Sequence, residues 1–578
     1  MRNLRGIISE SLAWTALATF LAIGVPLFLC MPLWVDTTYH DMSARNVLWG
    51  GVHYRDIFET NLPGMVWVHA LLRPLIGWSS EAIRAADLVV VGLSVLLIVW
   101  WLGWIGISRA TRVWFAASMA LFYIFETEFI HCQRDVWMLF PALVALHLRG
   151  RQLANIASGT DGSTLRRGIL EGIFWACAVW IKPHCWIPAL IVWMVSVRPL
   201  MGAGSPRRAL LDFFGLLAGG LLAGGLGSLW LIRTGAWPHM WDVLLNWNGE
   251  YYNWSLEEMD GRLSMVIMYF SPWSLIHYAA LPMAFAALIR ARVWNIAPMD
   301  GNARIGTALL AALYLGWFAQ ATFLQKSFHY SHTPVLILAF AVLTSQRWPV
   351  APIFVAWCLI GGTLHYYQDR DPTLFPWLSQ MKQERPNTMQ QLVPRHKLLS
   401  REWKTVWRRC LQGSDPELKT HLSFYRLNHC TPGWNDLHRV RIYLESLKLK
   451  DGELLCWDDS THPLYLDLNL RPAVRYMHVN TALDFRSKRE TIRQEVIQSG
   501  ARYAVGDLAV AWSFYGYGPS WVLDDDSLTL PPDFPCFCTH IFPWNQPIVF
   551  RAGRYVVLRI ENPIGEVRLP YPVRLNKP

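Results

Sequence analysis

The sequence predicts a polytopic α-helical membrane protein that carries a C-terminal α/β domain outside the cytoplasm. Three observations predict this fold class. The 578 residues are 53% hydrophobic and 16% charged, whereas soluble domains carry roughly 25% charged residues. Apolar runs recur between residues 12 and 366, and the composition changes to that of a soluble domain beyond them. The 32 Trp residues suit a membrane–water interface, because the indole ring is apolar and its N–H is hydrated there.

The apolar runs set the number of membrane spans. A helix needs about 20 residues to cross about 30 Å of hydrocarbon. Runs of that length, or slightly shorter, lie at residues 12–34, 85–107, 113–131, 136–148, 168–181, 185–197, 209–232, 264–289, 304–324, 333–345 and 349–366. We therefore predict about eleven transmembrane helices in a membrane domain over residues 1–366. The first run follows a basic end and is too long for a cleaved signal peptide, so it is predicted to be an uncleaved span.

The charged loops predict the orientation. Alternate loops are rich in Arg, as at Arg109, Arg112, Arg149, Arg151, Arg166, Arg167 and Arg290. The remaining loops are acidic, as at Asp36, Asp41, Asp56, Glu59, Asp135, Asp242 and Glu250. Basic loops stay in the cytoplasm, so we expect the N-terminus in the cytoplasm and the C-terminal domain outside it. We expect the protein to reside in the cell inner (cytoplasmic) membrane. The net charge of +10 resides largely in such loops and does not indicate a nucleic-acid partner.

Residues 367–578 are predicted to form the α/β domain. The patterns favour helices over 437–450 and 486–500, strands over 453–457 and 501–506, and a hairpin over 547–560 that turns at Ala552-Gly553. Strands that alternate with helices are typical of α/β domains. The region has an odd number of Cys residues and no CxxC pair, which disfavours zinc, whereas one or two disulfides would suit an extracytoplasmic location. These residues are Cys410, Cys430, Cys456, Cys536 and Cys538.

The first external loop, residues 35–84, begins with an unusual density of ionisable groups. The stretch YHDMSARNVLWGG, which starts at Tyr39, predicts a short helix at the outer interface that ends at Gly50-Gly51. Asp36 stands where the first span meets this helix, at the mouth of any cavity between the spans. An alternative is that Asp36 serves only as the helix N-cap, because Asp accepts backbone N–H bonds well at that position.

Three further polar clusters end spans on the same predicted face of the membrane. They are FETEFIHCQRDVW with Arg134 and Asp135, WIKPHCW with Lys182 and His184, and FLQKSFHYSH with Lys326 and His329. Charges at membrane depth usually face a cavity or a partner. The alternatives are an ion pair between Arg134 and Asp135 on an outer loop, and a Lys182 side chain that reaches out to the interface.

Together these clusters place several cations opposite the carboxylates of the first loop. A ring of cations suits a phosphate or diphosphate, since it can accept charge on the leaving oxygens. A nearby carboxylate suits removal of a proton from an acceptor hydroxyl, and the apolar spans would hold a lipid tail. The sequence has no GxxxxGK[ST], HExxH or GxSxG motif, and no spacing demands a metal, although a divalent cation remains an option. The pattern predicts a transferase that acts on a lipid-linked phosphate ester.

Five segments carry a resemblance to a known family: Asp36, Ala44-Arg45, GGVHYRDIFETNLPG from Gly50, QRD from Gln133 and KPH from Lys182. Over roughly residues 10–365 the chain resembles the GT-C superfamily of polytopic glycosyltransferases, and is most similar to its protein O-mannosyltransferase and lipid A aminoarabinose transferase branches. Asn61-Leu62-Pro63 stands where the aminoarabinose branch has Lys-Pro-Pro, which argues against a lipid A acceptor.

The resemblance implies an inverting transfer of sugar from a polyprenyl phosphate to an acceptor hydroxyl, in the biosynthesis of cell-envelope glycans. It implies that Asp36 is the catalytic base, that Asp135 is a second acidic residue, and that cations bind the donor phosphate. The predicted phosphate-binding residues are Arg134, Lys182, Lys326 and His329. The predicted sugar or acceptor pocket consists of Tyr54, Asp56, Glu59, Asn61 and His184.

The expected partners are a polyprenyl-phosphate-linked sugar, a glycan, lipid or protein acceptor, and the bilayer. A transporter or flippase of a lipid-linked sugar is the main alternative, because it would use the same cations and the same groove for the tail. A non-catalytic assembly or receptor subunit is the third option. The acidic first loop and the large external domain favour the enzyme.

Overall fold

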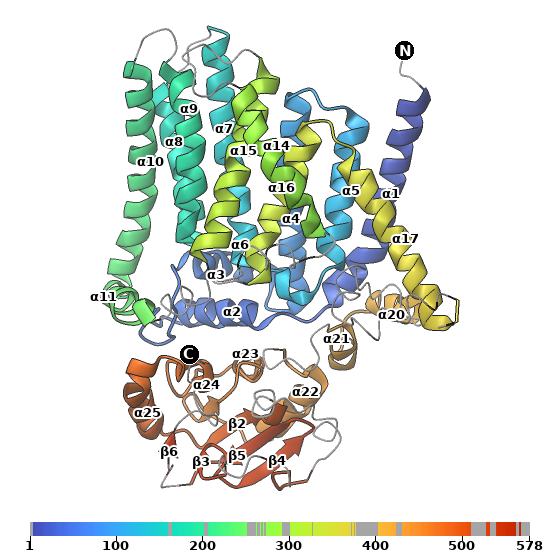
Figure 1. The fold of residues 1–578 in the computed structure, drawn as a ribbon. Helices are drawn as coiled ribbons and strands as arrows, with labels where there is room; N and C mark the ends of the chain where they lie inside the picture. The colour runs from blue at the N-terminus through green and yellow to red at the C-terminus, as the bar shows by residue number, and fades with distance from the viewer. Residues whose placement is uncertain are drawn as a thin grey trace, which may run out of the picture.

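The chain folds into a helical bundle with a smaller C-terminal layer beneath it (Figure 1). The computed structural model describes residues 4–159, 164–201, 206–250, 262, 266, 270, 273–291, 301–325, 328–371, 373, 374, 376, 403–423, 431–509, 527–531, 534, 539–561, 564, 566 and 567. The N-terminal end of the first helix and the C-terminal layer lie at opposite ends of the bundle.

Helices coincide with the predicted apolar runs. The long helices of the bundle are α1 (Leu4–Cys30), α4 (Ser80–Trp104), α5 (Arg109–Phe125), α7 (Leu139–Ala157), α8 (Thr164–Ile181), α9 (Trp186–Met201), α10 (Pro206–Arg233), α14 (His277–Arg290), α15 (Asn302–Ala319), α16 (Thr333–Ser345) and α17 (Val350–Arg370). Within the described chain, six segments are long and apolar enough to cross a membrane: Gly6–Cys30, Ser80–Trp104, Pro183–Met201, Pro206–Arg233, Trp273–Arg290 and Asn302–Leu324. The chain is therefore a multi-pass membrane protein, and a total of eleven spans stays a prediction.

Short helical turns join these helices and carry most of the polar clusters. They are η1 (Glu128–Ile130), α6 (Arg134–Trp137), η2 (Pro183–Cys185), α11 (Trp237–Asp242), η3 (Val243–Trp247), η4 (Trp273–Ile276), η5 (Gln320–Leu324) and η6 (His329–His332). Helix starts follow the local chemistry: the hydroxyl of Ser79 accepts the N–H of Ala82 at the start of α4, which satisfies a backbone donor that has no partner inside the helix.

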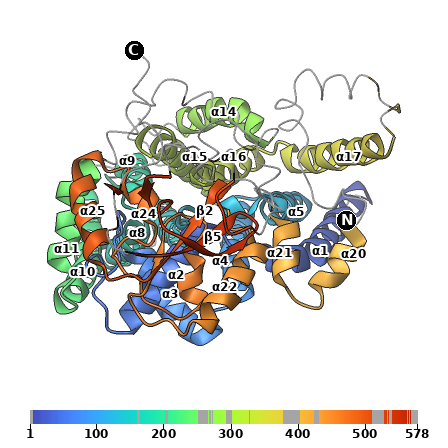
Figure 2. The ribbon, with the colours of Figure 1, turned by 90° about the horizontal axis from the view of Figure 1, so that it is seen from below.

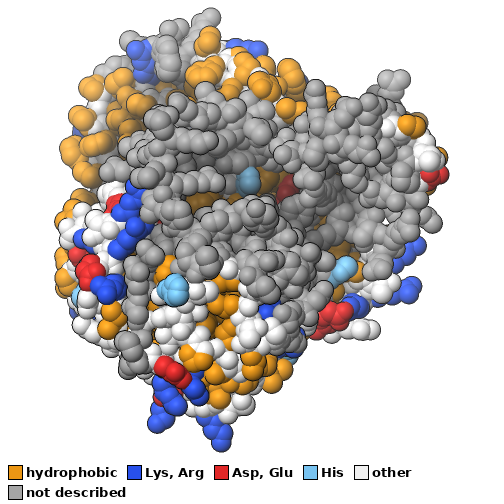
Figure 3. All heavy atoms as spheres, turned by 60° about the horizontal axis from the view of Figure 1, so that its bottom comes forward, with side chains coloured by type: hydrophobic (Ala, Val, Ile, Leu, Met, Phe, Trp, Pro, Cys, Tyr) orange, Lys and Arg blue, Asp and Glu red, His pale blue; other side chains and the backbone are white. Residues whose placement is uncertain are grey.

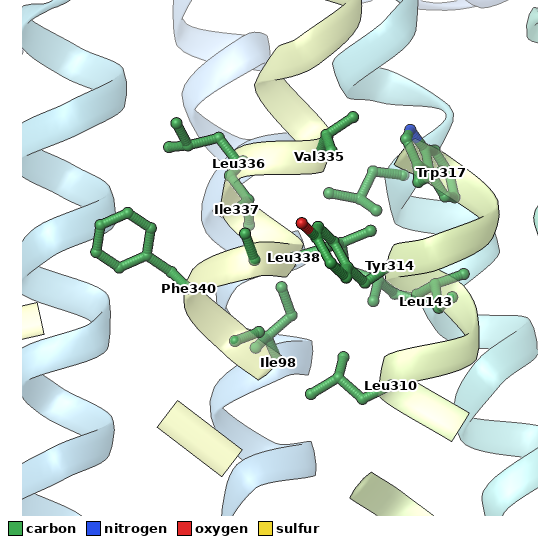
Figure 4. Packing of buried hydrophobic residues seen from close by; sticks show 14 of the residues in the cluster. Ile98, Leu143, Leu310, Tyr314, Trp317, Val335, Leu336, Ile337, Leu338 and Phe340 are labelled. Atoms are coloured by element: carbon green, nitrogen blue, oxygen red, sulfur yellow. The ribbon is translucent and has the colours of Figure 1, made fainter. Parts of the chain in front are cut away.

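The centre of the bundle is closely packed. Every residue of α16 is buried, and side chains such as Leu336 and Ile337 pack beside Ile98 of α4 and Tyr314 of α15 (Figure 4). Helices α8 and α10 approach at backbone distance, because a Cβ on Gly219 would lie 2.0 Å from the carbonyl oxygen of Ile169. Small residues allow such close contact between membrane helices.

A buried ion cluster links three helices. Arg149 of α7 lies 2.9 Å from Asp212 of α10 and 3.0 Å from Glu171 of α8, and all three side chains are shielded from solvent. Buried charges persist in proteins when they are paired, and removing one partner is strongly destabilising. This cluster lies on the bundle helices away from the polar loops described below, and we assign it a role in packing.

Residues 35–84, the predicted first external loop, form a shelf across the end of the bundle (Figure 1). It contains α2 (Val35–Leu48) and α3 (Gly64–Ile76). Helix α2 starts four residues before the predicted Tyr39 and ends, as predicted, before Gly50-Gly51. Asp41 holds α2 on α3, since its carboxylate accepts hydrogen bonds from Arg73 and contacts His69 at 2.7 Å. The shelf is therefore a fixed element.

An arm connects the bundle to the C-terminal layer. Its helices α20 (Trp403–Cys410) and α21 (Pro416–Leu422) pack Val406, Leu418 and Leu422 against the outer end of α1. The thiol of Cys30 donates to the carbonyl oxygen of Cys410 at 3.4 Å. Cys410 and Cys456 are free thiols, and the predicted disulfide candidates Cys430, Cys536 and Cys538 lie outside the described residues.

The C-terminal layer is an α/β domain built on a four-stranded sheet of order β1-β2-β5-β4. Its elements are α22 (Trp434–Ser446), β1 (Leu454–Cys456), α23 (Pro463–Asp467), α24 (Val479–Ala482), η8 (Arg486–Lys488), α25 (Arg489–Gln498), β2 (Tyr503–Asp507), β3 (Ile541–Phe542), β4 (Ile548–Ala552), β5 (Tyr555–Arg559) and β6 (Glu566–Val567). Strands β1 and β2 are parallel, whereas β2, β5 and β4 are antiparallel, and β3 pairs with β6. The predicted helices, strands and hairpin are confirmed, and Gly553 at the turn has φ 55°.

The two layers meet over the shelf. Seen from below, the C-terminal elements lie over α2, α4 and α8 (Figure 2). Backbone and side-chain bonds cross the junction: the N–H of Phe58 donates to the carbonyl oxygen of Arg475 at 2.9 Å, and Arg45 donates to that of Leu466 at 2.9 Å. With the C-terminal end of the molecule turned forward, charged side chains gather along the lower rim of the view, whereas hydrophobic side chains dominate its upper left edge (Figure 3). The predicted boundary at residues 366 and 367 stays a prediction, since α17 continues to Arg370.

Candidate active site

Three adjoining hollows lie where the bundle meets the shelf and the C-terminal layer. The cationic cavity, of about 530 Å³, is lined by Asn61, Arg134, Lys182, His184, Gln325 and Tyr330 among others. The interlayer cavity, of about 430 Å³, is lined by Asp36, His40, Glu59, Arg134, Asp459 and His478 among others. The apolar groove, of about 590 Å³, runs along α8, α9 and α10 and includes Trp175, Trp180, Trp193, Phe213, Leu217 and Gly220.

Shared lining residues show that the hollows adjoin one another. The cationic and interlayer cavities have Thr60, Asn61, Arg134, Phe328 and Tyr330 in common. The cationic cavity and the apolar groove have Leu62 and Leu244 in common. The three hollows therefore lie in sequence, with the cationic cavity between the apolar groove and the carboxylate-lined interlayer cavity.

Lys182 is the best-defined cation of this space. It follows α8 in an extended conformation, and Pro183 starts η2 directly after it. Its Nζ donates to Oδ1 of Asp135 at 2.6 Å, and the carboxylate is fully buried behind it. Asp135 lines neither cavity. The structure thus makes Asp135 a partner of Lys182, and the Lys182 ammonium does not simply reach out to the interface.

The charge of Lys182 is sensitive to pH. Burial lowers its pKa to about 8, although the Asp135 carboxylate opposes this shift. We expect binding of a phosphate ligand to weaken as the pH rises through about 8, because Lys182 then loses its proton. Titration calorimetry of polyprenyl phosphate between pH 6.5 and 9.5 measures this, and Lys182→Met is expected to bind weakly without the pH step. If Lys182→Met shows the same decrease in affinity over this pH range, the decrease belongs to another titrating group.

Asp36 lies on the interlayer side of this arrangement. It belongs to the first turn of α2, and Trp34 occupies the N-cap position. The pKa of Asp36 is raised, chiefly by burial and further by Asp459, while Arg134 opposes the shift. Arg134 lines both cavities, Lys182 lines the cationic cavity and Asp36 lines the interlayer cavity. The three predicted residues therefore line two adjoining cavities, and their roles stay a prediction.

Glu59 and Asn61 line the junction of the cavities. Oε1 of Glu59 accepts from the side-chain amide of Asn61 at 2.5 Å and from its backbone N–H at 3.0 Å. Burial raises the pKa of Glu59, with Arg134 opposing the shift. His40 lies 4.0 Å from Glu59, and its Nδ1 has no hydrogen-bond partner in the described structure. These groups are placed to hydrogen-bond a polyhydroxylated ligand.

Other predicted site residues lie elsewhere. Tyr54 is buried beneath the loop, where its hydroxyl donates to the carbonyl oxygen of Asn61 at 2.7 Å, so it supports the pocket and does not line it. Asp56 accepts the backbone N–H of Val52 at 2.7 Å and lies 2.6 Å from Arg55, so it fixes the local turn. His329 packs on Phe129, and its neighbours Phe328 and Tyr330 line the cavities instead. Lys326 lies outside the described residues.

The C-terminal layer contributes site residues that the sequence did not predict. Asp459, His462 and His478 line the interlayer cavity. Asp459 comes three residues after the carboxyl end of β1, and ligand sites form at the carboxyl ends of parallel strands. In the sequence, the pair Asp458-Asp459 directly after the strand predicted over 453–457 was the signal that could have identified these site residues. Among the described residues, no group of three or more His, Cys, Asp or Glu side chains could hold a metal ion, so no cation is assigned to the site.

Solved structures similar to this chain include two from Archaeoglobus fulgidus. One is the oligosaccharyltransferase in the apo form, with 13% identity over 87% of this chain and 70% of that chain and a TM-score of 0.42. The other is the archaeal oligosaccharyltransferase AglB in complex with an inhibitory peptide and a dolichol-phosphate, with 11% identity over 87% and 70% of the two chains and a TM-score of 0.43. No protein-family model and no curated protein matches the sequence.

Proposed function

We propose that the chain is a glycosyltransferase that moves a sugar from a polyprenyl-phosphate donor to an acceptor hydroxyl at the outer face of the cytoplasmic membrane. The observation that supports this proposal is the order of the three adjoining hollows. An apolar groove between helices shares lining residues with a cationic cavity, and the cationic cavity shares lining residues with a cavity that contains a buried carboxylate. A lipid tail, a phosphate and an acceptor hydroxyl need these environments in this order.

The donor would lie with its tail in the apolar groove and its phosphate in the cationic cavity. Lys182 and Arg134 would hold the phosphate, and both would gain interaction as negative charge grows on the leaving oxygen. Asp135 would act through Lys182 by fixing the position of its ammonium group. Binding an anion beside Lys182 also restores the proton that burial makes labile, since a nearby opposite charge favours the ionised form.

The sugar would lie at the junction, near Glu59 and Asn61, with its anomeric carbon facing the interlayer cavity. Asp36 would take the proton of the acceptor hydroxyl while the acceptor oxygen bonds to the anomeric carbon and the bond to phosphate breaks. The proposed base lines the interlayer cavity and the proposed phosphate-binding Lys182 lines the cationic cavity. Separate places for the base and the leaving group support a single displacement, which would invert the anomeric carbon.

The placement in the membrane follows from the loop charges. Arg-rich loops at the N-terminal side of the bundle favour the cytoplasm, which puts the shelf, the cavities and the C-terminal layer outside. A donor delivered to the outer leaflet would enter sideways from the bilayer, because the groove faces lipid between α8, α9 and α10.

The test uses the full chain purified in detergent. It is incubated with a panel of radiolabelled polyprenyl-phosphate hexoses and delipidated cell envelopes as the source of acceptor. Transfer of label to the envelope fraction, with release of polyprenyl phosphate, supports a transferase. Movement of the donor across sealed vesicles, with no product in detergent for any donor, would favour the transporter or flippase.

The apolar groove gives a separate prediction. Gly220 lines the groove and Gly225 does not, although both lie on α10 and have nothing within 4 Å of an added Cβ. We expect Gly220→Trp to raise the KM for a long-chain donor about 10-fold, since excluding one or two isoprene units removes more than 1 kcal/mol of apolar burial. Gly225→Trp is the matched control. Equal KM values for the two variants, measured with a long-chain donor, would show that the donor tail does not bind in this groove.

A further inference from the structure

The C-terminal layer brings a histidine and a carboxylate into the interlayer cavity. Nδ1 of His478 lies 2.9 Å from Oδ1 of Asp459, and both residues line the cavity with Asp36. Asp459 lies on the Nδ1 side of the ring, which leaves Nε2 as the other ring nitrogen. The pair is at ion-pair distance without hydrogen-bond geometry at Nδ1, so the carboxylate acts on His478 through its charge. A carboxylate this close stabilises the imidazolium and favours uptake of a proton by the ring.

A buried network fixes this pair. The side-chain amide of Asn480 donates to Asp458 at 3.0 Å, and the backbone N–H of Asp507 donates to the same carboxylate at 2.7 Å. The N–H of Asn480 donates to the carbonyl oxygen of Trp457 at 2.9 Å. Asp458 precedes Asp459, and Asn480 follows His478 by two positions. The ends of β1 and β2 therefore hold both members of the pair in one geometry.

Among the described residues, three carboxylates act on His478, and Arg134, Glu59 and His40 line the same cavity. Burial lowers the pKa of His478, but Asp459, Asp36 and Asp484 outweigh it and the net shift is upward. The rings of His462 and Tyr39 also pack near His478, at 5.5 and 5.9 Å between centroids. Burial lowers the pKa of His462 to about 3, so this second imidazole stays neutral where His478 titrates.

Asp36 needs a route for its proton. After each transfer it would hold the acceptor's proton inside a cavity covered by the C-terminal layer, and it must lose that proton before the next cycle. We propose, on the basis of the function proposed above, that His478 accepts this proton from Asp36 and passes it to solvent, with Asp459 as its positioning residue. The acceptor O–H proton thus goes to Asp36, then to Nε2 of His478, and then to water, while polyprenyl phosphate leaves as the anion.

The pH dependence of turnover tests this relay. Neutral His478 accepts a proton and imidazolium does not, so the wild-type rate should fall as the pH is lowered through the raised pKa of His478. Asp459→Asn removes the main cause of that raised pKa and should move the acid limb to lower pH. His478→Gln should lower kcat about 10²-fold and remove this limb, and added imidazole should restore part of the rate. The readout is release of polyprenyl phosphate by the full chain in detergent.

The matched control is His462→Gln, which changes a histidine of the same cavity and should leave the position of the acid limb unchanged. Polyprenyl-phosphate binding and thermal unfolding of each variant are measured alongside. A wild-type pH profile in His478→Gln, or a slow variant that imidazole does not rescue, would overturn the relay. Wild-type protein that makes no product from any donor would instead overturn the proposed function, so the two failures are distinguishable.

Discussion

Asp36→Asn is expected to reduce transfer about 10³-fold or more while the protein still binds polyprenyl phosphate. The side chain keeps its size and loses its ability to take a proton, and a positioned general base contributes 10²- to 10⁴-fold. Burial already disfavours the charged form of Asp36, so the amide should cost little stability. The measurement is product formation in detergent, together with polyprenyl-phosphate affinity and the thermal unfolding midpoint.

Asp56→Asn is the matched control for this experiment. Both aspartates lie in the first external loop, but Asp56 contacts Arg55 and the backbone of Val52 and lines none of the three hollows. Its substitution should leave turnover within about twofold, as for most surface changes. Near-normal turnover in Asp36→Asn would remove Asp36 from the chemistry. A large loss in Asp56→Asn would show that the sugar pocket reaches that turn, as the sequence predicts.

Lys182→Ala is expected to raise the KM for the donor about 10- to 100-fold, with a smaller effect on the acceptor. A hydrogen bond between charged groups contributes about 1.5–3 kcal/mol, and the Lys182 ammonium would lose its contact with the donor phosphate. The substitution also leaves Asp135 buried without its cation. Breaking a buried pair costs about 3–5 kcal/mol, so the thermal midpoint should fall as well.

A double variant separates these two effects. Lys182→Ala with Asp135→Asn removes both charges, so it should recover most of the lost stability and none of the lost donor affinity. Steady-state kinetics with donor and acceptor varied in turn, and thermal unfolding, provide the two readouts. Recovery of donor affinity in the double variant would mean that Lys182 acts through folding alone. An equal loss for donor and acceptor would also contradict a phosphate role.

Much of the secondary structure could be predicted because its causes are local. Helices α1, α4, α10 and α15 follow from the length of their apolar runs, and β1, β2 and α25 follow from periodicity and a following glycine. Boundaries were less predictable. The helix expected over 437–450 begins at Trp434 and ends at Ser446, since Lys448 adopts φ 51°, a conformation outside the helix that no sequence pattern there announces.

The site was predictable only where a residue type was unusual for its depth in the membrane. Asp36, Arg134 and Lys182 are costly at such positions, which is why the sequence singled them out. Tyr54 and Asp56 looked equally suitable, and only the turn of the loop directs them to Asn61 and Val52. Periodicity describes neighbours along the chain and carries no information about where a loop folds back.

The sequence by itself determined a membrane bundle with an α/β domain, and a concentration of ionisable groups at one end of the spans. Those properties depend on hydrophobicity and spacing over short segments. The tertiary structure alone decided that Asp135 holds Lys182 across 47 positions, and that His462 meets the backbone of Val35 across 427. Such contacts depend on how distant segments pack against each other, and this packing brings the His478–Asp459 pair beside Asp36.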